Sequence, residues 1–280
     1  MFTDPLFFLA LSAYLVCIAS LTTLSARLAS PCAAATALLP SNQPVAAKLL
    51  WQRLAIAPAF AAFLFLPQGS LPPFLPLNAG MPSLFALFFL ILLLLGTPSP
   101  AARAKATPAV IVGYGLLPLA IACAAAAFFA HMHGAPGSPF SMGTFSIMPL
   151  WSIMDIPART GLAVMAVGLL LCIGKAFPLA ASAAFAWYAL RLAVAHTFLT
   201  LLLPPLFIHF TPDFSFPLLY LLEAGLRWLL AFLLAHRLMP LASRMQNAVV
   251  GPLLFGLGLA LALGAMYVLP SGINLAKYGI

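Results

Sequence analysis

Apolar residues run along this chain in long blocks that end at a proline, a glycine or a charged residue. A helix needs about 20 apolar residues to cross the roughly 30 Å hydrocarbon core of a bilayer. The blocks predict eight membrane-spanning helices, of which the third and fifth are short; because the block ends are soft, seven or nine helices also fit. The predicted helices are approximately Leu6–Leu24, Lys48–Leu66, Pro82–Gly96, Pro108–Phe129, Ile156–Ile173, Leu179–Leu203, Pro217–His236 and Val249–Leu269.

The composition supports a membrane location for the whole chain. Of the 280 residues, 64% are hydrophobic and 6% are charged, and the mean hydropathy is +1.13. Soluble proteins carry about a quarter charged residues, so a soluble globule is excluded, and a disordered chain needs the opposite composition. The 12 Lys and Arg residues are scattered singly, which excludes a nucleic-acid-binding surface. We therefore expect an all-α integral membrane protein, a bundle of about eight helices that forms a single polytopic domain over residues 1–280.

The charged residues sort into two sets of alternate loops. Lys and Arg are retained on the cytoplasmic side of short loops. One set holds eight cations and no carboxylate and the other holds three acids and two bases, so we expect both termini on the outer side. No basic segment precedes the first block, which favours a spanning helix over a cleaved signal. The inner set is Arg27, Lys48, Arg53, Arg103, Lys105, Lys175, Arg237 and Arg244, and the outer set is Asp4, Asp155, Arg159, Asp213 and Lys277.

Four of the inner cations are candidates for a docking surface. Clusters of Lys and Arg next to the cytoplasmic leaflet attract anionic lipid headgroups and acidic partners. We expect such a surface at Arg53, Arg103, Lys105 and Lys175, and the alternative is that they only set the topology.

Three charged residues stand out inside the predicted helices. Charges at bilayer depth are costly, so each is a functional candidate that needs a partner. At 1.5 Å per residue, Arg191 and Glu223 lie roughly 18 and 20 Å from the inner face. Arg227 follows Glu223 at the i+4 spacing of a helical ion pair. One acid can then serve both cations, and we expect an ionised Glu223 to pair with Arg191 or Arg227. The pair is either a structural bridge between two helices, which we favour, or part of a charge relay.

No catalytic or metal-binding motif is found. His131 and His196 are the histidines that could face one haem or a quinol, although interfacial and helix-packing roles are commoner for histidine in membrane helices. The four cysteines lack paired spacing and read as small core residues. No phosphate-binding loop, nucleophile elbow or zinc motif occurs.

Short landmarks along the chain resemble the H-type membrane subunit of bacterial complex I and its relatives in membrane-bound hydrogenases and formate hydrogenlyase. The resemblance covers the second helix to the last. Its landmarks are Pro76-Leu77-Asn78-Ala79-Gly80, Ala102-Arg103-Ala104-Lys105-Ala106 followed by Tyr114-Gly115-Leu116-Leu117-Pro118-Leu119, Gly143-Thr144-Phe145-Ser146-Ile147 and, more loosely, Gly174-Lys175-Ala176-Phe177-Pro178.

The departures from this family concern its acidic residues. Ser25-Ala26-Arg27 stands in place of the family's Glu-Arg-Lys, Gly115 replaces the acid after the tyrosine, and Cys172 and Leu179-Ala180-Ala181-Ser182 occupy a stretch that is rich in Glu and Asp in the family. The resemblance therefore implies a non-catalytic membrane subunit with a reduced proton relay or none.

In the family, this subunit links a peripheral iron-sulfur arm to antiporter-like membrane subunits and lines a quinone cavity. The resemblance implies the same partners, a bacterial inner membrane location and no directly bound cofactor. It leaves open whether the chain binds quinone. The alternative is a quinol-oxidising or haem-bearing membrane anchor subunit, and a small-solute transporter is the third hypothesis.

Overall fold

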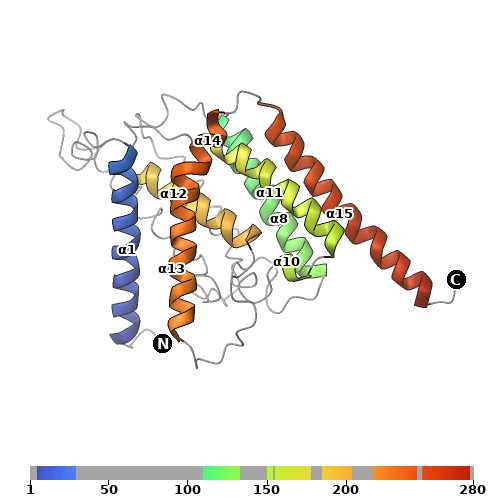
Figure 1. The fold of residues 1–280 in the computed structure, drawn as a ribbon, viewed down its shortest axis with the longest axis horizontal. Helices are drawn as coiled ribbons and strands as arrows, with labels where there is room; N and C mark the ends of the chain where they lie inside the picture. The colour runs from blue at the N-terminus through green and yellow to red at the C-terminus, as the bar shows by residue number, and fades with distance from the viewer. Residues whose placement is uncertain are drawn as a thin grey trace.

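The computed structural model describes residues 5–29, 110–132, 150–153, 155–177, 185–203, 217–244 and 248–277, and these ranges contain helices and no strand (Figure 1). Helical structure is thus confirmed for the described part of the chain. Lys48–Leu66 and Pro82–Gly96, the second and third predicted helices, lie outside it. The helices are α1 (Pro5–Ala29), η1 (Ile111–Leu116), α8 (Leu117–Met132), α10 (Leu150–Ile153), α11 (Ile156–Ala176), α12 (Phe185–Leu202), α13 (Pro217–Leu233), η2 (Leu234–Leu238), α14 (Met239–Arg244) and α15 (Val250–Lys277).

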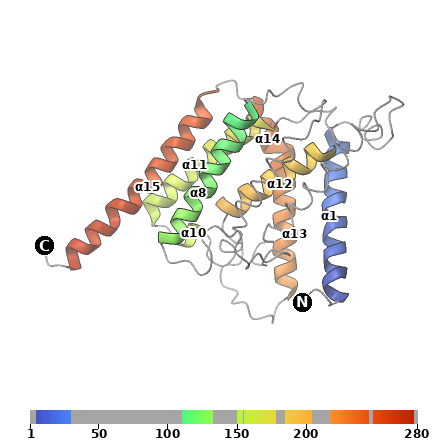
Figure 2. The same ribbon diagram turned by 180° about the vertical axis from the view of Figure 1, so that it is seen from behind.

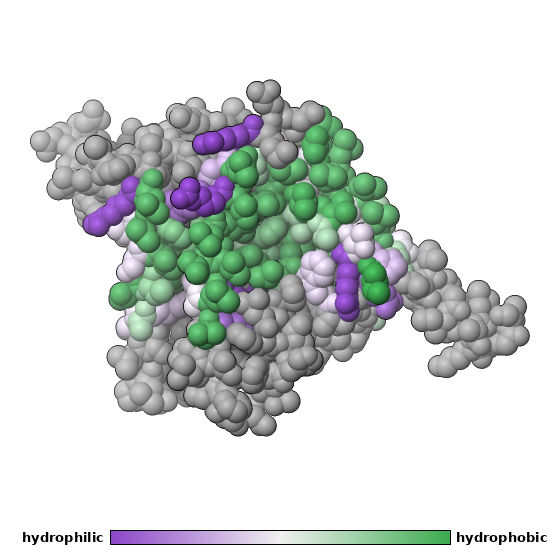
Figure 3. Space-filling view, viewed as in Figure 1, coloured by the Kyte–Doolittle hydropathy of each residue, from purple (hydrophilic) through white to green (hydrophobic). Residues whose placement is uncertain are grey.

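Among the described residues, three continuous helical stretches are long and apolar enough to cross a membrane. They are Ile111–Met132, Ile156–Ala176 and Leu222–Arg244. Many of their large apolar side chains face outward, and Figure 3 shows an apolar band between hydrophilic borders. An apolar surface of this extent is not stable in water, so these helices indicate a membrane protein.

Helices α11 and α15 form an antiparallel pair with very close backbones. A Cβ atom on Gly168 would collide with the backbone of Phe255, and one on Gly258 would collide with the backbone of Met165. Gly161 meets Ala262 in the same way. Small residues at these positions allow the close approach that packs helices in lipid, where the hydrophobic effect does not drive helix association.

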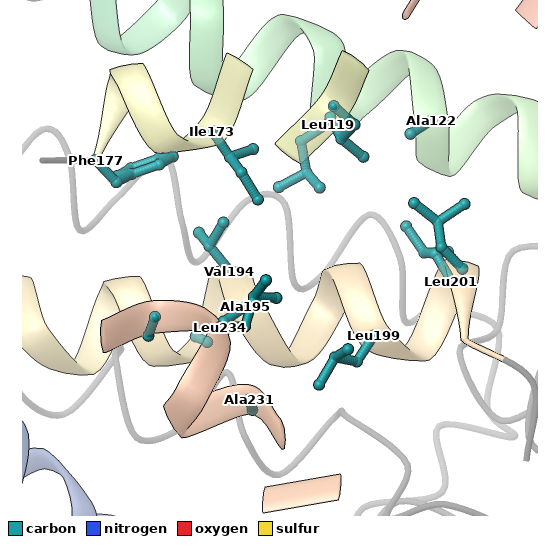
Figure 4. Close-up of a cluster of buried hydrophobic side chains, with 14 of the residues drawn as sticks. Leu119, Ala122, Ile173, Phe177, Val194, Ala195, Leu199, Leu201, Ala231 and Leu234 are labelled. Atoms are coloured by element: carbon teal, nitrogen blue, oxygen red, sulfur yellow. The ribbon is translucent and has the colours of Figure 1, made fainter. Parts of the chain in front are cut away.

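Helix α12 is the centre of the bundle. Figures 1 and 2 show it crossing α1 and α13 at a large angle, and its residues from Trp187 to Leu202 are almost all buried. In Figure 4, Val194 and Ala195 of α12 lie opposite Leu119 and Ile173 of α8 and α11, and α13 lies on its other side. A helix that is buried on all faces is typical of such a central position.

Two π-turns interrupt the long helices directly before prolines. The N–H of Leu117 bonds to the carbonyl of Val112, and the N–H of Met239 bonds to that of Leu234, each one residue further back than in an α-helix. The next residues, Pro118 and Pro240, have no N–H. At the same spacing, the next donors would bond to the carbonyls of Gly113 in η1 and Ala235 in η2, and because these donors are missing the two carbonyls do not receive that bond.

Candidate functional site

The first candidate site lies where α12 ends inside the bundle. Pro204 and Pro205 follow the helix, and a proline cannot continue it. The last carbonyls of α12 are bonded by side chains instead: the Trp151 Nε1–H donates to Leu202, and Arg227 Nη2 donates to Leu203 over 3.5 Å. A guanidinium at a helix C-terminus also opposes the partial negative charge of the helix dipole.

The same arginine forms the ion pair that the sequence predicts. Arg227 Nε donates to Glu223 Oε1 over 3.4 Å, one helical turn apart on α13, and both side chains are at least 95% buried. Arg227 thus joins the acid of its own helix to the end of α12. This arrangement connects two helices, which is what a structural bridge requires.

An aromatic layer lies next to this ion pair, around the following residue, Trp228. Trp228 stacks on the His196 ring at 4.8 Å between centroids and meets Tyr14 edge-on at 5.8 Å, so α1, α12 and α13 contact one another here. The buried hydroxyls of Thr197 and Thr200 bond to carbonyls of their own helix. The rings of Tyr14, His196 and Trp228 belong to residues that are at most 9% exposed, so the layer is buried.

Arg191 lies in a second site, and the prediction that one acid serves both arginines is wrong. Its Nη2 donates to the carbonyl of Ala235, the one that η2 leaves without a helical donor. Twelve residues of helix separate Ala235 from Glu223, which is about 18 Å along the axis. The depth estimate failed because α12 crosses the bundle obliquely (Figure 1) instead of running parallel to α13.

The inner docking candidates are described only in part. Lys175 lies at the end of α11 with its Nζ 5.1 Å from the centre of the Tyr114 ring. A cavity of about 40 Å³ lies beside them, between α11 and the start of α15, and it has room for no more than a few water molecules. Arg53, Arg103 and Lys105 lie outside the described residues.

The two histidines lie in different surroundings. His131 is exposed on the last turn of α8, whereas the face of the His196 ring packs against Trp228. Two axial ligands would have to face the same macrocycle. Within the described ranges, no group of three or more His, Cys, Asp or Glu residues could hold a metal ion.

No protein-family model, curated protein or solved structure matches this chain. Function therefore has to be inferred from the residues and their geometry. The role of the Ala235 carbonyl has no counterpart among the sequence predictions. Pro240 indicates that a backbone donor is missing nearby, but not which side chain replaces it.

Proposed function

We propose that this protein is an integral membrane subunit of a complex I-like or hydrogenase-like redox-driven ion-translocating assembly. It links a peripheral iron-sulfur arm to antiporter-like membrane subunits and has a reduced proton relay or none. In this proposal the chain crosses a bacterial inner membrane eight times with both termini outside, and quinone binding stays open.

The observation that carries the proposal is the contact between two landmarks of the family resemblance. The Tyr114 motif and the Gly174–Phe177 segment are about 60 residues apart in the sequence, yet they pack together at one end of the bundle. Lys175 lies over the Tyr114 ring, and the Gly115 Cα faces Ala176 and Phe177. This contact supports the proposal because it joins two segments that the resemblance picks out independently.

The same contact supports a reduced relay. A Cβ atom on Gly115 would lie 2.8 Å from Ala176 Cβ and 2.9 Å from the Phe177 ring, so the glutamate of the family does not fit there. Glu223 is held by Arg227 in a bridge between helices. A proton relay needs several titratable groups in series.

Affinity purification of the tagged chain from its native membrane tests the proposal. We expect iron-sulfur and antiporter-like subunits to co-purify. Lys175→Ala should reduce recovery of the peripheral arm, while Arg159→Ala, which removes an exposed arginine at the start of α11, should not. Purification of the chain without redox partners would contradict the proposal, and a Soret band from the isolated chain would favour the haem-bearing anchor instead.

A further inference from the structure

The cavity beside Lys175 lies at the level where the membrane-spanning stretches end. Its walls come from the last turns of α11, from η1, from α14 and from the first turn of α15. The stretch Ile111–Met132 begins at this level, and Ile156–Ala176 and Leu222–Arg244 end at it. Figure 1 shows α14 and the start of α15 at this same end of the bundle. In a bilayer around these helices, the cavity therefore lies at the boundary between the hydrocarbon core and the headgroups.

The wall of this cavity carries a positive charge that no described acid balances. Lys175 is half-buried, and its Nζ lies 5.1 Å from the centre of the Tyr114 ring. A ring face attracts a cation but does not neutralise it. Among the described acids, Glu223 is paired with Arg227, and Asp155 stands at the other end of α11, about 30 Å away along the helix axis. The ammonium group is thus available to an anion from outside the described part of the chain.

The size of the cavity fits one phosphate group. A phosphate group has four oxygens, each about the size of a water molecule, so a space for a few water molecules can take most of it. Lysine binds phosphate as a compact charge with three N–H donors. Basic pockets between transmembrane helices are known to hold the headgroups of anionic lipids.

The apolar surroundings favour a lipid over an acidic protein as the source of this phosphate. Apart from Lys175 and Tyr114, the walls are apolar or small side chains such as Leu171 and Ala248. On α15, which forms one wall, Val249 and Leu253 are 59% and 64% exposed and lie one helical turn apart. A phospholipid supplies both a charge for the lysine and acyl chains for this exposed face.

We propose that the cavity between α11, α14 and the start of α15 binds the phosphate of an anionic phospholipid, with Lys175 as its cationic ligand. The acyl chains lie against the exposed face of α15. The site is separate from the Glu223–Arg227 bridge. It does not depend on the proposed place of the protein in a redox assembly, because lipid binding is a property of the chain alone.

Native mass spectrometry of the delipidated full-length chain in detergent tests this site. The chain is titrated with dioleoylphosphatidylglycerol or with dioleoylphosphatidylcholine, which has the same acyl chains and no net charge. We expect one phosphatidylglycerol to bind tightly and phosphatidylcholine to bind more weakly. Lys175→Gln should weaken phosphatidylglycerol binding by about fivefold, the effect of one lysine near an anionic headgroup. An excess of inorganic phosphate should not displace the lipid, because it has no acyl chains.

Three further variants separate the cavity from general surface charge. Arg159→Gln removes an exposed cation from the other end of α11 and should bind phosphatidylglycerol like the wild type. Lys175→Arg keeps the charge and should also bind it. Ala248→Leu keeps every charge but places a larger side chain in the wall of the cavity, so it should lose binding, which covers the case that Lys175→Gln does not fold.

Three results would overturn the proposal. The first is equal binding of phosphatidylglycerol by the wild type, Lys175→Gln and Ala248→Leu. The second is displacement of the lipid by inorganic phosphate, which would assign the site to free phosphate. The third is equal binding of the two lipids by the wild type, which together with a loss of co-purifying protein from Lys175→Gln would assign Lys175 to an acidic protein partner.

Discussion

Replacing Glu223 with glutamine should destabilise the junction of α12 and α13. The amide has the shape of the carboxylate and can still accept from Arg227 Nε, so the main loss is the negative charge. The guanidinium, 4% exposed, would then have only the carbonyl of Leu203 and the neutral amide as acceptors. Removing one partner of a buried ion pair costs about 3–5 kcal/mol in soluble proteins.

A double-mutant cycle tests whether this loss of stability comes from the unpaired charge of Arg227. With Glu223→Gln and Arg227→Gln combined, no unpaired charge remains, so the double variant should be more stable than Glu223→Gln alone. It would still lack the guanidinium at the end of α12, an interaction worth about 0.3–2 kcal/mol. Residues in direct contact show coupling energies of about 0.5–3 kcal/mol, and we expect a value at the upper end of this range for Glu223 and Arg227.

Reversible unfolding in mixed detergent measures these differences, and recovery of assembled complex reports the same loss in the membrane. If Glu223 is part of a structural bridge, Glu223→Gln should reduce stability and assembly, and any change in proton flux should only follow from that loss. Normal stability and assembly together with lost proton translocation would refute it and make Glu223 part of a relay.

Three other predictions follow from the fold. Gly168→Leu should separate α11 from α15 and strongly lower the melting temperature, because the leucine side chain would collide with the Phe255 backbone. Gly256→Leu is the control: this glycine has no neighbour within 4 Å, so the melting temperature should change little. Pro240→Ala supplies an N–H that can donate to the Ala235 carbonyl, so it should recover part of the stability that Arg191→Met loses. If Arg191→Met and the double variant Arg191→Met/Pro240→Ala had equal melting temperatures, this prediction would be wrong. A reporter fused after the last residue should be active on the outer side of the membrane, and a cytoplasmic signal would reverse the orientation.

The sequence was sufficient to predict most of the helices. Long apolar blocks reveal helices whatever their neighbours, and six of the eight predicted blocks correspond to described helices. The i+4 spacing of Glu223 and Arg227 likewise predicts a pair that depends only on local geometry. Both features can be predicted because they depend only on the local sequence.

The position of Arg191 could not be predicted in this way. Residue counts give depth only when a helix runs along the membrane normal, and α12 does not run parallel to α13 (Figure 1). Its bond to the Ala235 carbonyl also depends on a π-turn in another helix, 44 residues away. Contacts of this kind arise from the packing of helices and have no local signature.

The π-turn of η2 also acts as a one-residue insertion in an otherwise regular helix. Residues on either side of it belong to two helical wheels that differ by about 100°, the rotation of one residue. Deleting a residue within η2 would restore regular hydrogen bonding but rotate α14 by this angle. Met239 and Ala242, which now lie against Gly174 of α11, would then face elsewhere, so the length of this segment is as constrained as its composition.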